Sequence, residues 1–119
     1  MTMATQLALR LVTDDIWSYV EPLLPSARTR PQGGGRARVE NRAVFTAVVF
    51  VLATGCTWHR LPPAFAVSAS TAHRRFLEWT LAGLWDRVEH VPPDRRITPT
   101  EREWLRALAT EARARVGRT

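Results

Sequence analysis

The stretch from Ala43 to Ala53 is the most apolar part of the chain and does most to restrict how it can fold. Its 11 residues are too few to cross a bilayer, which takes about 20. Its valines favour a strand locally, but the stretch lacks the two-residue alternation of a half-buried strand. Gly55 follows where a helix C-cap is expected. The pattern therefore predicts a central, buried helix that begins near Asn41 and ends at Gly55.

A shorter helix is predicted to begin at Thr13, whose hydroxyl can cap the first turn. Asp14 and Asp15 follow in that turn, where negative charge is favoured by the helix dipole. Pro22 lacks an amide hydrogen, so the helix should break or restart there, and Pro25 should end it.

The C-terminal part of the chain predicts an autonomous helix over residues 98–116. Thr98 and Glu101 have the spacing of a capping box, and Pro99 stands at the first helical position. Apolar residues then recur every four positions, at Trp104, Leu108, Ala112 and Val116. This stripe either docks on the core or forms the seam of a dimer.

The segment over residues 70–79 has the pattern of a helix with one buried face and one free face. The apolar stripe consists of Ala72, Phe76 and Trp79, and the opposite face of Ser70, Thr71, Arg74 and Glu78. A tight corner over residues 54–65 precedes it, which predicts two short helices joined by a turn. Further helical packing is expected from Leu81, Leu84, Trp85 and Val88, until Pro92 and Pro93 close the unit.

The whole chain, 1–119, is thus expected to form one all-α domain, a small helical bundle with a helix-turn-helix unit and a C-terminal amphipathic helix.

Charge points to a polyanionic partner. The chain carries 17 basic and 11 acidic residues, a net charge of +6, and every basic residue is an arginine. Arginine's planar fork suits phosphate and guanine contacts better than an ammonium group does. Nucleic acid is therefore favoured over a membrane, with a solvated basic surface that binds nothing as the alternative.

Residues 26–38 have no apolar periodicity, and they combine three consecutive glycines with four arginines, Arg28, Arg30, Arg36 and Arg38. This composition is typical of a flexible basic arm. The arm is either a solvated linker or a segment that orders on phosphate or enters a minor groove.

Other chemistries have weaker support in the sequence. Cys56 and His59 have a ligand-like spacing, but a second close pair is missing, so we expect no metal and no cofactor. The single cysteine excludes an internal disulfide, and without a signal peptide pattern the expected location is cytoplasmic. The five tryptophans could stack on bases, but they fall mostly on apolar stripes, which favours core packing.

Five motifs, taken together and in order, resemble one known domain. They are Thr13-Asp14-Asp15-Ile16-Trp17, Glu21-Pro22-Leu23-Leu24-Pro25, Gly34-Gly35-Arg36-Ala37-Arg38, Thr54-Gly55-Cys56-Thr57-Trp58 with Leu61-Pro62, and Arg74-Arg75-Phe76 with Trp79, Gly83 and Trp85. The chain resembles, over residues 11–90, the N-terminal domain of bacterial insertion-sequence transposases of the IS-four/IS-five type. The resemblance implies a helix-turn-helix unit that binds the terminal inverted repeats of the element and positions a separate catalytic domain.

The sequence also departs from that family. The catalytic domain of that family, which this chain is expected to lack, holds two metal ions with an Asp-Asp-Glu triad. Two-metal chemistry requires carboxylates that converge on ions about 4 Å apart. The acidic residues here predict helix starts and helix surfaces instead, so we expect no enzyme activity from this chain. His59 and Arg60 stand where an arginine and an acidic residue are common, and Ala37 replaces a frequent proline, which bears on the choice of target sequence.

The expected function is sequence-specific binding of double-stranded DNA. The residues expected in the major groove are Arg74, Arg75, Ser70, Thr71 and His73, with Arg74 the better candidate for a base contact. Arg28, Arg30, Arg36 and Arg38 are expected at phosphates or in the minor groove, and Arg42 and Arg60 at the DNA backbone. The chain would be an upstream-frame product, a recruited repressor or an element remnant, with a second copy or a full-length transposase as further partners. The alternative is a protein-interaction module built on the C-terminal stripe, or an inert remnant.

Overall fold

The computed structural model describes residues 10–25, 40–93 and 96–118. Within these ranges every regular element is helical, which confirms the all-α class. The elements are α2 (Asp14–Val20), η1 (Glu21–Leu23), α3 (Asn41–Thr54), η2 (Trp58–Arg60), η3 (Pro63–Phe65), α4 (Ala69–Leu81), α5 (Leu84–Glu89) and α6 (Pro99–Arg118). Among the described residues, no helix combines the length and the apolar character needed to cross a bilayer.

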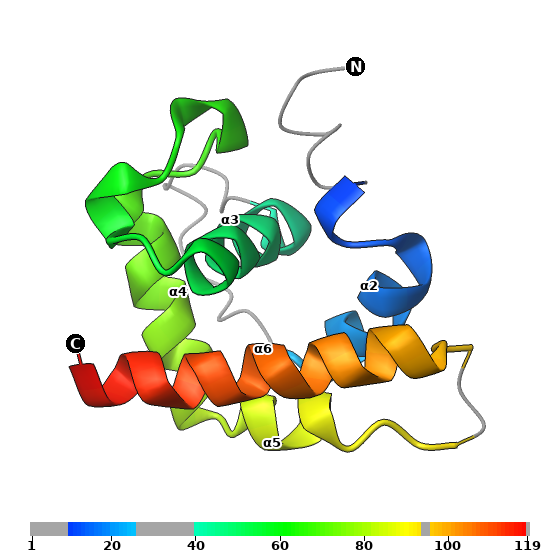
Figure 1. Cartoon of the computed structure of the whole chain (residues 1–119). Coiled ribbons are helices and arrows are strands. Elements are labelled where there is room, and N and C mark those ends of the chain that lie inside the picture. Colours follow the sequence, from blue (N-terminus) through cyan, green and yellow to red (C-terminus); the bar gives the residue numbers. More distant parts are fainter. Residues whose placement is uncertain (1–9, 26–39, 94–95, 119) are drawn as a thin grey trace, which may run out of the picture.

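Helix α3 lies at the centre, with α2, α4 and α6 around it (Figure 1). Residues 44–49 are all buried, together with Val51 and Leu52. The backbone of Gly55 is left-handed, with φ of 72°, and its N–H donates to the carbonyl of Val51. Glycine reaches this conformation without the steric cost that a Cβ brings, so the helix ends here. The predicted central helix and its C-cap are confirmed.

Helix α2 begins where the sequence predicts. The Thr13 hydroxyl accepts a hydrogen bond from the amide of Ile16 at 3.2 Å. The α-helical pattern stops at Val20, and the chain continues as a 3₁₀ turn with Pro22 in its first turn. A proline is tolerated at that position because the amide it lacks would have no partner there.

The long helix α6 begins with the predicted capping box. The Glu101 amide donates to the Thr98 hydroxyl at 3.1 Å, and the Thr98 amide donates to the Glu101 carboxylate at 3.0 Å. Both bonds satisfy amides that the first turn cannot pair within the helix.

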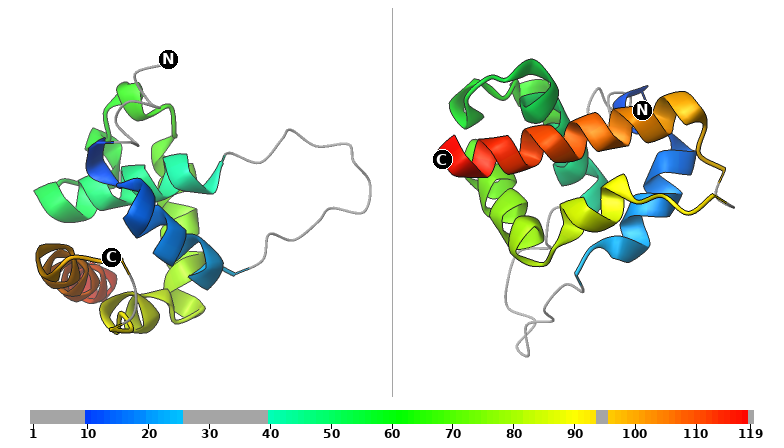
Figure 2. Two further views of the ribbon diagram at one scale, coloured as in Figure 1. Left: turned by 90° about the vertical axis from the view of Figure 1, so that its right-hand side faces the viewer. Right: turned by 60° about the horizontal axis from the view of Figure 1, so that its bottom comes forward.

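The apolar side of α6 docks on the core rather than forming a free seam. The helix packs along α5 and α3 (Figure 2). Leu105, Leu108, Ala109 and Ala112 are buried, whereas Val116 is 38% exposed. The structure thus supports the docking alternative for the middle of the predicted stripe, where contacts within the chain bury Leu108 and Ala112.

Helices α4 and α5 are separated by Gly83, whose left-handed backbone, with φ of 79°, turns the chain. Leu84, Trp85 and Val88 of α5 are buried, as expected. Leu81 is 90% exposed, so its expected part in this packing is wrong. It is the last residue of α4 and faces away from the helices that bury its neighbours.

Candidate nucleic-acid interface

Helix α4 has the two faces that its sequence predicts. Ala72, Phe76 and Trp79 are buried in the core, whereas Ser70 and Arg74 are exposed. The side chain of Ser68 caps the helix and accepts from the amide of Thr71 at 3.1 Å. The first two turns therefore present polar side chains from a helix that is anchored along its opposite side.

Arg75 does not belong to the exposed face. Its side chain is 1% exposed, and its Nη1 donates to the Asn41 side-chain oxygen at 2.8 Å. A buried charge requires such a partner to offset its lost hydration. The expectation that Arg75 enters a groove is wrong, because its guanidinium faces the interior and joins α4 to the start of α3.

Arg42 also has structural contacts. It forms an ion pair with Asp14 at 2.9 Å and donates to the carbonyl of Val12 at 2.6 Å. Its side chain is only 17% exposed. These bonds tie the first turn of α3 to the start of α2, so the structure uses Arg42 within the bundle rather than presenting it on the surface.

Two other predicted contact residues are half-buried. The Thr71 hydroxyl accepts from the Ser68 hydroxyl at 2.9 Å, within the cap of α4. The His73 ring stacks on Trp58, with centroids 5.1 Å apart and an interplanar angle of 26°. His73 therefore lies beside the exposed face of α4, against the loop that precedes it.

Residues 55–68 connect α3 to α4. The corner predicted over residues 54–65 contains the 3₁₀ turns η2 and η3, anchored by Trp58 and Phe65. His59 and Arg60 lie at the end of η2 and are exposed. The turn η2, which ends at Arg60, contacts α4.

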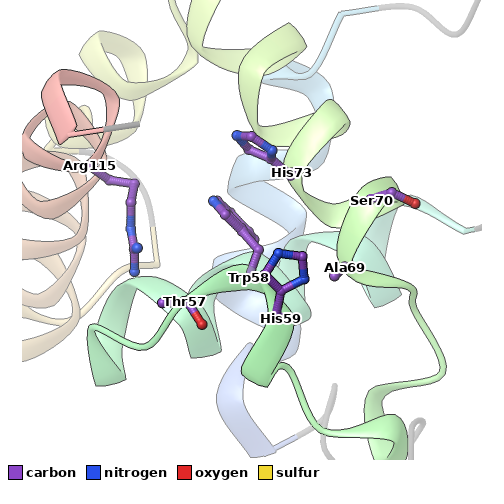
Figure 3. Close-up of a pocket in the computed structure, with 7 residues that line it drawn as sticks. All are labelled: Thr57, Trp58, His59, Ala69, Ser70, His73 and Arg115. Atoms are coloured by element: carbon purple, nitrogen blue, oxygen red, sulfur yellow. The ribbon is translucent and has the colours of Figure 1, made fainter.

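A solvent-open cleft of about 390 Å³ lies between η2, the first turns of α4 and the far end of α6. It is lined by Thr57, Trp58, His59, Ala69, Ser70, His73 and Arg115. Figure 3 shows Arg115 reaching from α6 to the side of the cleft opposite Ala69 and Ser70. The sequence did not single out Arg115, because a residue this far along the chain reaches the cleft only through the docking of α6.

Two acidic side chains of α5 pair with an arginine of α6. Arg113 of α6 pairs with Asp86 and Glu89 of α5. Hydrogen bonding from Arg113 holds the pKa of Glu89 below its ordinary value, and Glu89 in turn raises the pKa of the Arg113 guanidinium. Both effects follow because each charged form stabilises the other. This cluster braces α5 against α6.

The four arginines of the predicted arm, Arg28, Arg30, Arg36 and Arg38, lie outside the described residues. Within the described ranges, no group of three or more His, Cys, Asp or Glu side chains is placed to hold a metal ion. The tryptophans Trp17, Trp58, Trp79 and Trp85 are buried, which confirms core packing for these four.

Comparisons with known proteins identify the family. A family model described as "Putative transposase of IS4/5 family (DUF4096)" matches residues 12–89, which include α2 to α5. A relative from Burkholderia cepacia, "Insertion element IS402 uncharacterized 16.2 kDa protein", is 39% identical over 87 residues, which is 71% of this chain. The aligned part spans 59% of that relative's length. No solved structure matches the chain. The resemblance seen in the sequence is confirmed, and the chain belongs to the IS4/5 transposase family, which relates it to transposition.

Proposed function

We propose that this chain binds double-stranded DNA sequence-specifically, with the N-terminal half of α4 in the major groove. The observation that carries the proposal is the division of α4 into a buried face and an exposed polar face that bears Ser70 and Arg74. The major groove admits an α-helix, and residues near the helix start contact base edges in helix-turn-helix proteins.

In this proposal Arg74 reads a base, because a guanidinium can donate two parallel hydrogen bonds to guanine. One such pair contributes about 1–3 kcal/mol of discrimination against a wrong base. Ser70 and Thr71 lie one turn earlier and contact the adjacent base or phosphate. Arg75 is left out of the contact set, since its burial and its bond to Asn41 support a structural role.

Phosphate contacts come from the exposed Arg60 and from the arm arginines Arg28, Arg30, Arg36 and Arg38. Arginines that neutralise phosphates release condensed counterions, which strengthens binding to any sequence and makes it dependent on salt. The net charge of +6 supports this electrostatic contribution. His73 lies at the edge of the exposed face of α4 that is proposed to contact DNA.

The family suggests the target, which is the terminal inverted repeats of an insertion element.

We propose that the described part positions DNA rather than cutting it. Its carboxylates support this reading, because Asp14, Asp86, Glu89 and Glu101 are engaged in ion pairs or a helix cap instead of converging on a metal site. This role implies a protein partner bound at the same DNA ends, either a second copy of the chain or a full-length transposase.

A fluorescence-anisotropy titration tests the proposal. The protein is titrated against an element-end duplex and against a scrambled duplex of equal length, at roughly 50 and 200 mM salt. We expect tighter binding to the element end at both salt concentrations and a steep loss of affinity with salt for both duplexes. Equal affinities would contradict sequence specificity, and no binding at the lower salt concentration would contradict DNA binding altogether.

A further inference from the structure

Two ring nitrogens beside the cleft are buried without a hydrogen-bond partner. They are Nε1 of Trp58 and Nε2 of His73, which belong to side chains that line the cleft and stack on one another. Buried polar groups in folded proteins are nearly always paired, and an exception calls for an explanation, of which a bound group is one. Their common position therefore indicates that the cleft takes a ligand.

The surroundings of Trp58 restrict the chemistry of that ligand. The indole ring is packed by His73 on one side and by Phe76, with centroids 5.2 Å apart, and the Arg115 guanidinium lies 5.7 Å from the ring centroid. A nucleobase has little room to stack on it. The part of the indole that remains for a ligand is its unpaired N–H group. This group can only donate a hydrogen bond, so the ligand must supply an acceptor.

The charge of the lining favours an anionic acceptor. Arg115 contributes a permanent positive charge, and the seven lining residues include no carboxylate. Ala69 and Ser70 belong to the first turn of α4, a helix of 13 residues, where the positive end of the helix dipole lies. A phosphate group suits a guanidinium, an indole N–H and a helix start together.

We propose that the cleft seats one phosphate of the DNA backbone and thereby sets the register of α4 along the groove. This inference rests on the proposed DNA-binding function. His73 and Arg115 are half-buried beside Trp58, and Nη2 of Arg115 donates to the carbonyls of Val51 and Cys56, which holds the guanidinium at the cleft. Arg115 lies beyond residues 12–89, so α6 adds a contact from outside the part that the family model matches.

Nuclear magnetic resonance of the ¹⁵N-labelled full chain tests directly whether the cleft binds a phosphate group, because each tryptophan indole N–H gives its own signal. The Trp58 signal is assigned with Trp58→Phe, which keeps an aromatic ring but removes the pyrrole part of the indole and with it the N–H donor. Element-end duplex and inorganic phosphate are titrated separately, with ionic strength matched by sodium chloride. We expect the duplex to shift the Trp58 signal strongly and inorganic phosphate to shift it weakly in the same direction.

Affinity measurements on variants provide the second readout. Arg115→Gln should lower the slope of log affinity against log salt by about 1, as loss of one phosphate contact does. Trp58→Phe should weaken binding roughly 3- to 10-fold at unchanged slope, since a neutral donor is lost. Arg106→Gln is the matched control, because Arg106 is an exposed arginine of the same helix outside the cleft. It should change affinity less than about 2-fold.

The outcomes separate this proposal from the proposed function. Duplex binding with an unmoved Trp58 signal, or Arg115→Gln no weaker than Arg106→Gln, would overturn the phosphate seat and leave DNA binding intact. A Trp58 signal that shifts with inorganic phosphate in a chain that binds no duplex would identify a site for free phosphate and overturn both. Circular dichroism of each variant checks that the helices are retained, and the titrations that follow the Trp58 signal are made on the unmodified chain.

Discussion

Nη1 of Arg75 donates a hydrogen bond to Oδ1 of Asn41 at 2.8 Å, inside a bundle that leaves the arginine 1% exposed. The bond joins the middle of α4 to the first residue of α3. Because α4 carries the proposed DNA-contacting face, this buried pair helps to fix the angle at which that face is presented. It accompanies a difference between two adjacent arginines, since Arg75 is buried and Arg74 is exposed.

The first prediction concerns this pair. Asn41→Ala removes an acceptor from a buried guanidinium and should lower the free energy of unfolding by about 1.5–3 kcal/mol, the range for a hydrogen bond to a charged group. Urea unfolding followed by circular dichroism measures the loss. Arg75→Met is the second variant of a double-mutant cycle, because it removes the charge of residue 75 and keeps a long apolar side chain.

In the Arg75→Met background the further change Asn41→Ala should cost markedly less, which gives a positive coupling energy in the double-mutant cycle. Additive losses within about 0.5 kcal/mol would show that the pair does not interact in solution. The cycle thus separates the bond from any effect of Asn41 on the helix start.

Local features of the fold could be predicted from the sequence because their causes are local. The caps at Thr13 and Thr98 and the end of α3 at Gly55 each depend on residues within one turn. The role of Arg75 could not be read this way. Its partner lies 34 positions earlier in the chain, and only the packing of α3 against α4 brings the two together.

The candidate site was predictable only in part, for the same reason. The spacing of α4 identified Arg74 and Ser70, because helical periodicity separates exposed from buried faces. The cleft depends on η2, α4 and α6 meeting, which no periodicity reveals, and so Arg115 was missed. The apolar stripe of α6 likewise fits a docked helix and a dimer seam equally well until its neighbours are known.

The second prediction concerns base recognition by Arg74. Arg74→Ala should reduce the preference for the element-end duplex over a scrambled duplex by about 1–3 kcal/mol, because a bidentate contact to guanine is lost. Anisotropy titrations on single-base-pair variants of the site should place the loss at one or two positions. Arg106→Ala, which removes an exposed arginine on α6, is the control and should leave the preference unchanged. An equal loss on every sequence would contradict base reading by Arg74.

The third prediction concerns the arm. Arg36→Ala should weaken binding to the element-end and scrambled duplexes by the same factor, since a phosphate contact carries no base information. The slope of log affinity against log salt should fall by about 1. A loss confined to the element end would instead place Arg36 at a base, and an unchanged slope would make the arm a linker.

The fourth prediction concerns the docking of α6. Leu108→Ala should lower the free energy of unfolding by about 2–5 kcal/mol, because the side chain is 4% exposed and its removal leaves a cavity. Leu81→Ala makes the same chemical change at a residue that is 90% exposed. It should alter stability by no more than about 0.5 kcal/mol. Urea unfolding of both variants decides the point, and similar losses would contradict the described packing.

The last prediction concerns pH and the capping box of α6. The pKa of Glu101 is lowered, first because its carboxylate accepts from the Thr98 amide, and further through the hydroxyls of Thr98 and Thr13, although partial burial opposes the shift. A carboxyl group with a lowered folded pKa adds stability above its ordinary pKa and loses it as pH falls through the folded value. Urea unfolding should therefore show Glu101→Gln less stable than the unmodified chain near neutral pH, with the difference shrinking as the pH falls below the ordinary glutamate pKa of about 4.3.

The matched variant Thr98→Ala removes the hydroxyl acceptor and should cost about 1 kcal/mol near neutral pH, as loss of a threonine cap does. The carboxylate still accepts from the residue 98 amide in this variant, so part of the pH dependence should persist. In Glu101→Gln that part should be gone, because a glutamine side chain has no charge to lose. If Glu101→Gln and the unmodified chain kept a constant difference in stability from neutral to acid pH, the ionised capping box would not contribute to the stability of α6.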